Sequence, residues 1–154
     1  MKKEMKRCPW SAGDPLMASY HDKEWGKPVH DDRKIYEFLV LETFQAGLSW
    51  RTVLHKRENF RKAFAGFNLR KVSGFGAKDR ARLLRNPGII RNRAKIEAAI
   101  LNARRFLEVR REFGTFSRYM WSWVEGRPLP HRFQRQGDCP AFIPEAQAWA
   151  KDLQ

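Results

Sequence analysis

The clearest hydrophobic pattern along the chain lies between residues 32 and 47, where apolar side chains recur at helical spacing. Its apolar members are Ile35, Phe38, Leu39 and Ala46. Asp31 or Asp32 can cap the first turn, so the stretch predicts an amphipathic helix. Glu42 comes one turn after Phe38, where the pattern calls for an apolar side chain, and we therefore expect its carboxylate to point inward.

The same spacing predicts further helices. They cover residues 49–64, residues 78–85, a longer stretch that follows the turn Asn86-Pro87-Gly88 and stops at Gly114, residues 116–123, and a last segment from Glu145. Residues 126–144 carry four prolines and little periodicity, which indicates a long surface loop. No stretch shows convincing strand alternation. We therefore expect an all-α fold, with residues 1–154 forming a single compact domain.

Charge is the feature of the composition that says most about partners. Lysine and arginine number 31 against 17 aspartates and glutamates, which gives a formal net charge of +14. Such an excess attracts polyanions and makes binding to nucleic acid sensitive to salt. The alternative is a surface charge that only keeps the protein in solution. At 42% hydrophobic and 13% aromatic residues, the chain is too rich in core formers to be a disordered basic tail.

The two cysteines, Cys8 and Cys139, are too few for a disulfide framework and suit a reducing compartment. No apolar run approaches the roughly 20 residues that cross a bilayer, and the first residues lack the pattern of a secretory signal. We expect a cytoplasmic, nucleoid-associated protein with no membrane partner.

Three segments combine aromatic and ionisable side chains. They are residues 7–10, residues 20–26 and residues 42–50. A nucleobase taken out of the helix needs flat faces to stack on and a few groups that bond its edge. Trp10, Tyr20 and Trp50 are candidates for the faces, and Glu42 for the edge. The alternative is that these aromatics are ordinary core, but a buried carboxylate is costly unless something bonds or pairs with it.

These segments, together with residues 50–59, 88–96 and 121–124, closely resemble the 3-methyladenine DNA glycosylase I family. The resemblance runs in order from Cys8 to about Leu153. It implies a fold of the helix-hairpin-helix DNA glycosylase type. It also implies the removal of 3-methyladenine from alkylated double-stranded DNA, which leaves an abasic site without a lyase step or strand cleavage.

The resemblance assigns roles to particular positions. Glu42 matches the carboxylate that recognises the methylated adenine, and it is the one candidate catalytic residue. The aromatic walls of the base pocket match Trp10, Tyr20 and Trp50. Met17 stands where some relatives have tyrosine, so one base contact differs. The segment that approaches DNA at the flipped nucleotide matches Gln45, Gly47 and Leu48.

The chemistry of the lesion agrees with these roles. Methylation at N3 makes the base cationic, which weakens its glycosidic bond and favours stacking on aromatic rings. A carboxylate in a dry aromatic pocket would bind that cation better than the neutral free base, so little further acid-base machinery is needed. Candidate phosphate contacts are Arg91 and Arg93, followed by Lys95, Arg104 and Arg105, unless this run is only a solvated helix face.

The resemblance also implies a structural zinc ion, and no organic cofactor. Cys8 and His21 match the first pair of ligands. The second pair, and the hairpin that holds a DNA phosphate, are expected beyond the last residue of this sequence. The chain is therefore expected to carry half a zinc site and to lack the C-terminal helices. His131 and Cys139 are an alternative second pair that does not match the family's spacing.

Three functions remain open on this reading. The first is a monomeric glycosylase acting on DNA that contains alkylated adenine. The second is a non-catalytic remnant of the family that binds damaged DNA but cannot complete the hydrolysis. The third is a basic helical protein associated with RNA, which the lesion-pocket motifs disfavour. Release of 3-methyladenine separates the first two.

Overall fold

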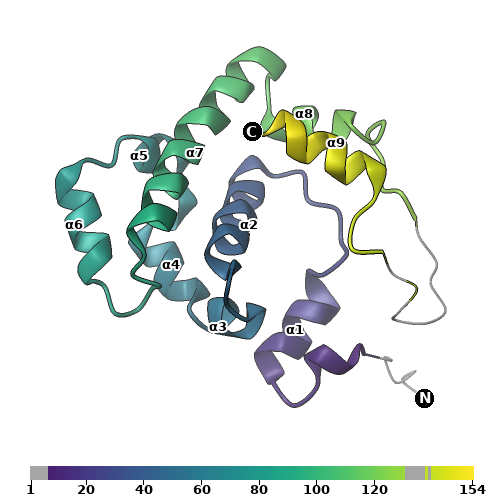
Figure 1. Cartoon of the computed structure of the whole chain (residues 1–154), viewed down its shortest axis with the longest axis horizontal. Helices are drawn as coiled ribbons and strands as arrows, with labels where there is room; N and C mark the ends of the chain where they lie inside the picture. The colour runs from purple at the N-terminus through teal and green to yellow at the C-terminus, as the bar shows by residue number, and fades with distance from the viewer. Residues whose placement is uncertain (1–6, 131–137, 139) are drawn as a thin grey trace.

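The computed structural model of the chain describes residues 7–130, 138 and 140–154 (Figure 1). Every regular element among these residues is a helix, which confirms the expected all-α class. In chain order the elements are η1 (Pro9–Ser11), α1 (Pro15–Lys23), α2 (Asp32–Gln45), α3 (Trp50–His55), α4 (Arg57–Ala63), η2 (Ala65–Phe67), α5 (Leu69–Ser73), α6 (Ala77–Arg85), α7 (Arg93–Phe113), α8 (Phe116–Ser122) and α9 (Pro144–Asp152).

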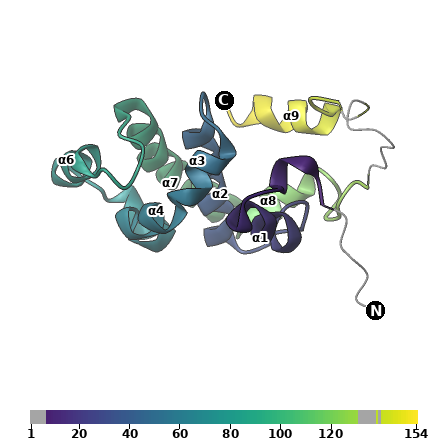
Figure 2. The same ribbon diagram turned by 90° about the horizontal axis from the view of Figure 1, so that it is seen from below.

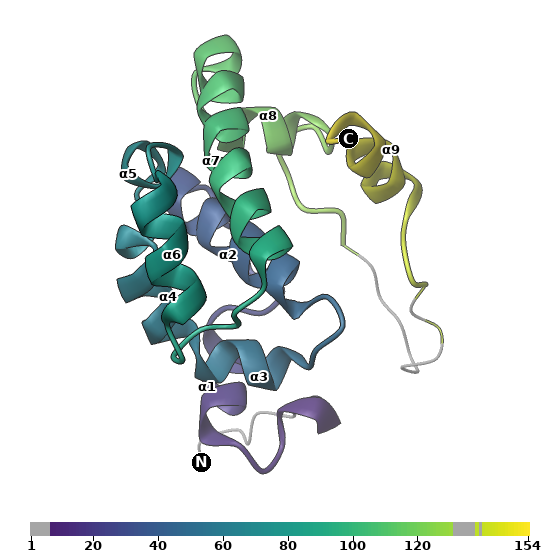
Figure 3. The same ribbon diagram turned by 60° about the vertical axis from the view of Figure 1, so that its left-hand side comes forward.

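The core lies around α2 and α7, with α4 to α6 on one side and α1 and α3 at one end (Figures 1 and 3). Tyr36 of α2 is fully buried, and its hydroxyl donates to the carbonyl oxygen of Ala99 in α7 at 2.8 Å. Phe44, Phe60 and Phe64 pack edge and face against one another in the same core. The two central helices therefore share an aromatic core, from which the end of α2 leads to the cavity described below.

The helix predicted over residues 49–64 is in fact two helices. The chain bends at Lys56, whose φ of −95° and ψ of 0° end α3, and its N–H donates to the carbonyl oxygen of Val53 at 3.0 Å. The bend is followed by Arg57, which is buried and bonded to the carboxylates of Glu24, directly after α1, and Glu37 of α2. Tertiary contacts thus override a continuous helical pattern.

Helix α1 was not predicted, because only Met17 among its residues is buried and its apolar pattern is weak. Its signal was local. Asp14 accepts hydrogen bonds from the backbone N–H groups of Leu16 at 2.9 Å and Met17 at 3.2 Å, and Pro15 occupies the first helical position. An Asp-Pro pair of this kind is a typical helix start.

Helix α9 lies beside α8 (Figures 1 and 2), where the hydroxyl of Tyr119 donates to the carboxylate of Asp152. Trp149 of α9 packs against the core, although no residue of α9 is fully buried. Among the helices that the structure describes, none is long and apolar enough to cross a membrane.

Candidate active site

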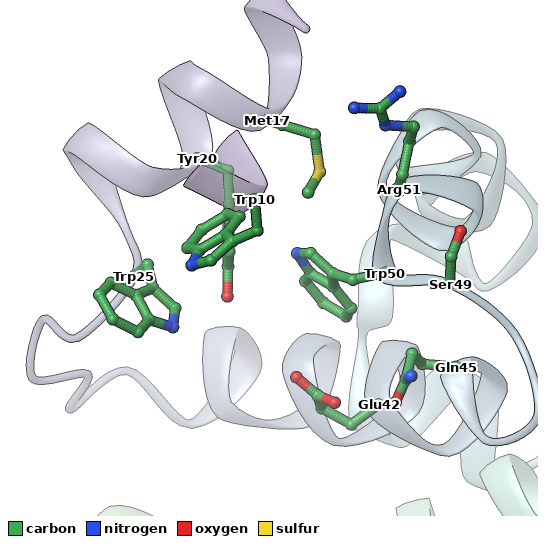
Figure 4. Close-up of a pocket in the computed structure, with 9 residues that line it drawn as sticks. All are labelled: Trp10, Met17, Tyr20, Trp25, Glu42, Gln45, Ser49, Trp50 and Arg51. Atoms are coloured by element: carbon green, nitrogen blue, oxygen red, sulfur yellow. The ribbon is translucent and has the colours of Figure 1, made fainter. Parts of the chain in front are cut away.

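A cavity of about 480 Å³ lies between α1, α2 and α3 (Figure 4). The predicted site residues on its wall are Trp10, Met17, Tyr20, Glu42, Gln45 and Trp50. Three residues that were not assigned to the site also line it, namely Trp25, Ser49 and Arg51. Trp25 and Ser49 fall within the aromatic segments, and Arg51 lies in the stretch 50–59 that resembles the family, although the sequence analysis assigned no role to it.

Two helix N-cap residues position the side chains that line this cavity. Asp14 starts α1 and thereby places Met17 and Tyr20. Ser49 starts α3, because its hydroxyl accepts from the N–H of Thr52 at 3.1 Å, and Trp50 is the first residue of that helix. Short polar residues at helix starts therefore fix the directions from which the two helices reach the cavity.

The aromatic walls contact one another. The rings of Tyr20 and Trp50 are 5.3 Å apart between centroids, with 50° between their planes. Trp10 lies 6.3 Å from Tyr20 and 5.4 Å from Trp25, the latter pair edge to face. Burial, followed by the charges of Glu42 and Glu24, raises the pKa of the Tyr20 hydroxyl, so this group remains a hydrogen-bond donor at neutral pH.

Glu42 is exposed rather than turned into the protein interior, which corrects the expectation drawn from its place in the helix. Its carboxylate faces the open cavity, on the side of Trp50 away from Arg51 in Figure 4. The aromatic walls still remove part of its water, and this burial raises the pKa of the Glu42 carboxyl. No cation among the described residues pairs with it, so its negative charge is available to a ligand.

The buried carboxylate of α2 is instead Glu37, which is 4% exposed. It accepts from Nε of Arg57 at 2.8 Å and Nε of Arg61 at 2.7 Å, while both terminal nitrogens of Arg57 bond Glu24 at 2.8 Å. Burial opposes the ionisation of Glu37, but the two arginines outweigh it and hold its pKa at about 2. This network ties the end of α1 to α2 and α4.

The turn after α2 presents Gly47 and Leu48 to solvent. Gly47 has a φ of 79°, which a residue with a side chain adopts only with strain. The side chain of Gln45 donates to the carbonyl oxygen of Leu48 at 2.9 Å, and the N–H of Leu48 donates to the carbonyl oxygen of Gln45 at 2.7 Å. The turn is thus closed on itself, with the Leu48 side chain 39% exposed.

A helical hairpin formed by α6 and α7 carries the predicted phosphate contacts, and the turn predicted at Asn86-Pro87-Gly88 lies between its two helices. Gly88 lies in this turn, where a Cβ would come 3.0 Å from Oδ1 of Asn86 and 3.1 Å from Cγ of Asn59 in α4, so a larger residue would require these side chains to shift. Arg91 and Arg93 are both exposed beside the turn.

The other three arginines and lysines proposed for phosphate are already engaged within the protein. Lys95 donates to the carbonyl oxygens of Phe44 at 2.9 Å and Ala46 at 2.5 Å. Arg104 donates to the carbonyl oxygen of Ser73, and Arg105 pairs with Glu108. These contacts leave Arg91 and Arg93 as the better candidates.

The predicted zinc ligands do come together. The backbone N–H of Cys8 donates to Nε2 of His21 at 3.3 Å, and Nδ1 of the same ring bonds Asp22 at 3.0 Å. Within residues 7–130, 138 and 140–154, no group of three or more histidine, cysteine or acidic side chains could hold a metal. His131 and Cys139 lie outside the described residues. The described pair alone does not fit a structural zinc ion, which requires four ligands, so the zinc site stays a prediction.

Comparison with known proteins gives the same family as the sequence motifs. The family model for methyladenine glycosylase matches residues 10–154. The DNA-3-methyladenine glycosylase 1 of Escherichia coli (strain K12) is 42% identical over 149 residues, which are 97% of this chain and 80% of that protein. A crystal structure of 3-methyladenine DNA glycosylase I is similar with a TM-score of 0.92 and 44% identity, over 96% of this chain and 81% of that one.

A tyrosine-to-phenylalanine variant of 3-methyladenine DNA glycosylase I, solved in complex with 3-methyladenine, is also similar. Its TM-score is 0.92 at 35% identity, over 97% of this chain and 80% of that one. The resemblance drawn from the sequence motifs and the fold that it implied are both confirmed. The chain belongs to the methyladenine glycosylase family.

Proposed function

We propose that this protein is a DNA repair glycosylase that removes 3-methyladenine from double-stranded DNA. The observation that carries the proposal is Glu42, whose carboxylate has no cation partner among the described residues and faces an aromatic cavity large enough for a base. A neutral base offers such a group no charge to pair with. The cationic lesion does, and its ring can stack on the aromatic walls.

The reaction breaks the glycosidic bond between the base and C1′ of the sugar. Water supplies the hydroxyl that replaces the base on C1′ and releases one proton, while the bonding electrons leave with the base. The cationic base therefore departs as neutral 3-methyladenine. The charge that attracted it to Glu42 disappears on departure, which favours product release.

The chain's own residues supply selection and electrostatics. Glu42 stabilises positive charge, first on the bound base and then on the sugar as its oxocarbenium character develops. Leu48 is exposed on the closed turn beside the cavity, where it can fill the space that the flipped nucleotide leaves in the duplex. Arg91 and Arg93 are available to bond phosphates. We further propose that the protein acts as a monomer, on DNA in the cytoplasm.

The test is chromatography of the bases released from methylated DNA by the purified chain. We expect 3-methyladenine to appear, and its release to fall at least a hundredfold in Glu42→Gln, which keeps the size of the side chain and removes its charge. Full release by Glu42→Gln would remove Glu42 from the mechanism. No release by the wild-type chain, together with salt-dependent binding of damaged DNA, would instead support the non-catalytic binding protein.

A further inference from the structure

Of the nine described residues that line the cavity, only Glu42 and Arg51 carry a charge. Arg51 belongs to α3, one residue after the aromatic wall Trp50 and three residues after the exposed Leu48. Its side chain is 53% exposed at the mouth of the cavity. Figure 4 shows Arg51 and Glu42 on opposite sides of the Trp50 ring, so the cation does not lie beside the carboxylate.

Asp14 explains how this arginine is held. Its Oδ1 accepts from the N–H groups of Leu16 and Met17, and its Oδ2 bonds Nε2 of His55 at 2.8 Å. Nε of Arg51 lies 3.4 Å from the same Oδ2. Both oxygens are therefore occupied, and Asp14 orients the guanidinium by its Nε edge without taking up its terminal nitrogens.

A nucleotide whose base enters the cavity leaves its sugar and the two adjoining phosphates at the mouth. The terminal nitrogens of an arginine form a planar fork that matches the oxygens of a phosphate. At this mouth Arg51 supplies such a guanidinium group. The guanidinium lies away from Glu42, so it does not repel the cationic base where Glu42 recognises it.

We propose that Arg51 binds a backbone phosphate next to the flipped nucleotide, and that Asp14 is the positioning residue that orients it. The inference rests on the proposed function, because it assumes that a base is flipped into this cavity. It differs from the contacts of Arg91 and Arg93, because an undamaged duplex, with no nucleotide at the cavity, does not bring a phosphate to Arg51.

The experiment measures binding to two duplexes that differ only at one position, an adenine or a flipped-out abasic analogue, over a series of salt concentrations. For Arg51→Met we expect affinity for the abasic duplex to fall about tenfold and its salt slope to drop by about one, with little change on the undamaged duplex. Arg93→Met should weaken both duplexes alike. Arg118→Met, which changes an exposed arginine of α8 that does not line the cavity, should change neither.

Two further variants test the role of Asp14 and the need for a fork. Asp14→Asn keeps the helix cap, since asparagine caps as well as aspartate, but it loses the charge that orients Arg51. We expect it to lower the preference for the abasic duplex without weakening undamaged binding, which a merely structural defect would not do. Arg51→Lys should keep the salt slope and regain only part of the affinity.

The two proposals fail separately. If Arg51→Met retains the wild-type preference for the abasic duplex, the phosphate contact is wrong whether or not the protein releases 3-methyladenine. If the wild-type chain releases no base but Arg51→Met loses that preference, the proposed activity is wrong and the contact stands. If the protein is active, Arg51→Met should raise the protein concentration needed for half-maximal excision more than it lowers the excision rate at saturating protein.

Discussion

The rings of Tyr20 and Trp50 are 5.3 Å apart between centroids and inclined at 50°. A base sandwiched between two parallel rings needs about 7 Å, because stacked carbon atoms lie about 3.5 Å apart on each side. The pair is therefore too close to receive a base between its faces as it stands. Nε1 of Trp50 is buried without a hydrogen-bond partner among the described residues, so no polar contact keeps the indole in this position.

We expect Trp50 to shift when it stacks on a base, and to supply most of the stacking energy. In Trp50→Leu, affinity for free 3-methyladenine should fall between about fivefold and 150-fold, which corresponds to about 1–3 kcal/mol for one stacked base. Isothermal titration calorimetry measures this without relying on tryptophan fluorescence. Tyr20→Phe is the matched control, because it keeps a ring of the same size and removes only the hydroxyl. Equal affinities in wild type and Trp50→Leu would show that the base stacks elsewhere.

The activity should depend on the charge of Glu42, whose pKa is raised by burial. As the pH falls through this raised pKa the carboxylate takes up a proton and loses its attraction for a cationic base. Excision should therefore fall on acidification at a higher pH than an ordinary glutamate, with a pKa of about 4.3, would give. Single-turnover rates from pH 4 to pH 8 measure the midpoint. A rate that stays flat down to pH 4 would contradict this assignment.

The same group makes a prediction about stability. Because the pKa of Glu42 is raised in the folded state, the protonated carboxyl group stabilises the fold relative to the ionised one. This stabilisation is lost as the pH rises through the raised pKa. At neutral pH, Glu42→Gln should therefore unfold at the same temperature as wild type or slightly higher, while excision falls. A clear loss of thermal stability would mean that Glu42 supports the fold as well as the site.

The sequence predicted which residues line the cavity better than it predicted how buried they are and which groups they contact. Trp10, Tyr20 and Trp50 lie in ordered family motifs, and the fold brings all three to one cavity. The inward-pointing carboxylate was predicted at Glu42, whereas the buried one is Glu37 of the same helix. Their burial is decided by partners that no local pattern reveals, in particular Arg57, which is 20 residues beyond Glu37 in the chain.

The break between α3 and α4 and the contacts of Lys95 were missed for the same reason. Helical periodicity records which face of a segment is apolar, but it does not record which polar groups meet across the fold. Helix α1 is a different case, because Asp14 and Pro15 form a local start signal that the sequence contained. That helix was therefore predictable, whereas the use of Lys95 within the protein was not.

Glu37 gives a stability prediction with an internal control. Removing its charge leaves Arg57 with Glu24 as its one anionic partner among the described residues, so Glu37→Gln should cost about 3 kcal/mol, at the lower end for a broken buried pair. The unfolding temperature should drop by roughly 6–12 °C for a protein of this size. Glu58 pairs with the same Arg61 but its side chain is 69% exposed, so Glu58→Gln should change stability by a few tenths of a kcal/mol at most.

The pH dependence of this network follows from the lowered pKa. Glu37 is held at about 2, below its unfolded value, so its contribution is present above a pH of about 4.3 and is lost as the pH falls from there toward 2. The difference in unfolding free energy between wild type and Glu37→Gln should narrow over that range. A difference that stays constant down to pH 2 would show that lost packing, rather than lost charge, destabilises the variant.

Lys95 connects the start of α7 to the turn of Gly47 and Leu48, which is proposed to approach DNA. Its ammonium group bonds the carbonyl oxygens of Phe44 and Ala46, directly before Gly47 and Leu48. In Lys95→Met these carbonyl groups lose their partner, and the turn should open more often. We therefore expect the amides of residues 47 and 48 to exchange hydrogen faster in the free protein, by about tenfold, which corresponds to about 1.4 kcal/mol.

Arg93→Met separates this effect from a simple loss of positive charge. Arg93 is exposed two residues away on the same helix, so its substitution should weaken DNA binding while amide exchange at residues 47 and 48 stays as in wild type. Lys95→Met should instead change the exchange in the absence of DNA and reduce the preference for a flipped-nucleotide duplex. If its exchange matches wild type and only the salt slope of binding changes, Lys95 acts as a phosphate contact, and its bonds to the end of α2 do not hold the turn.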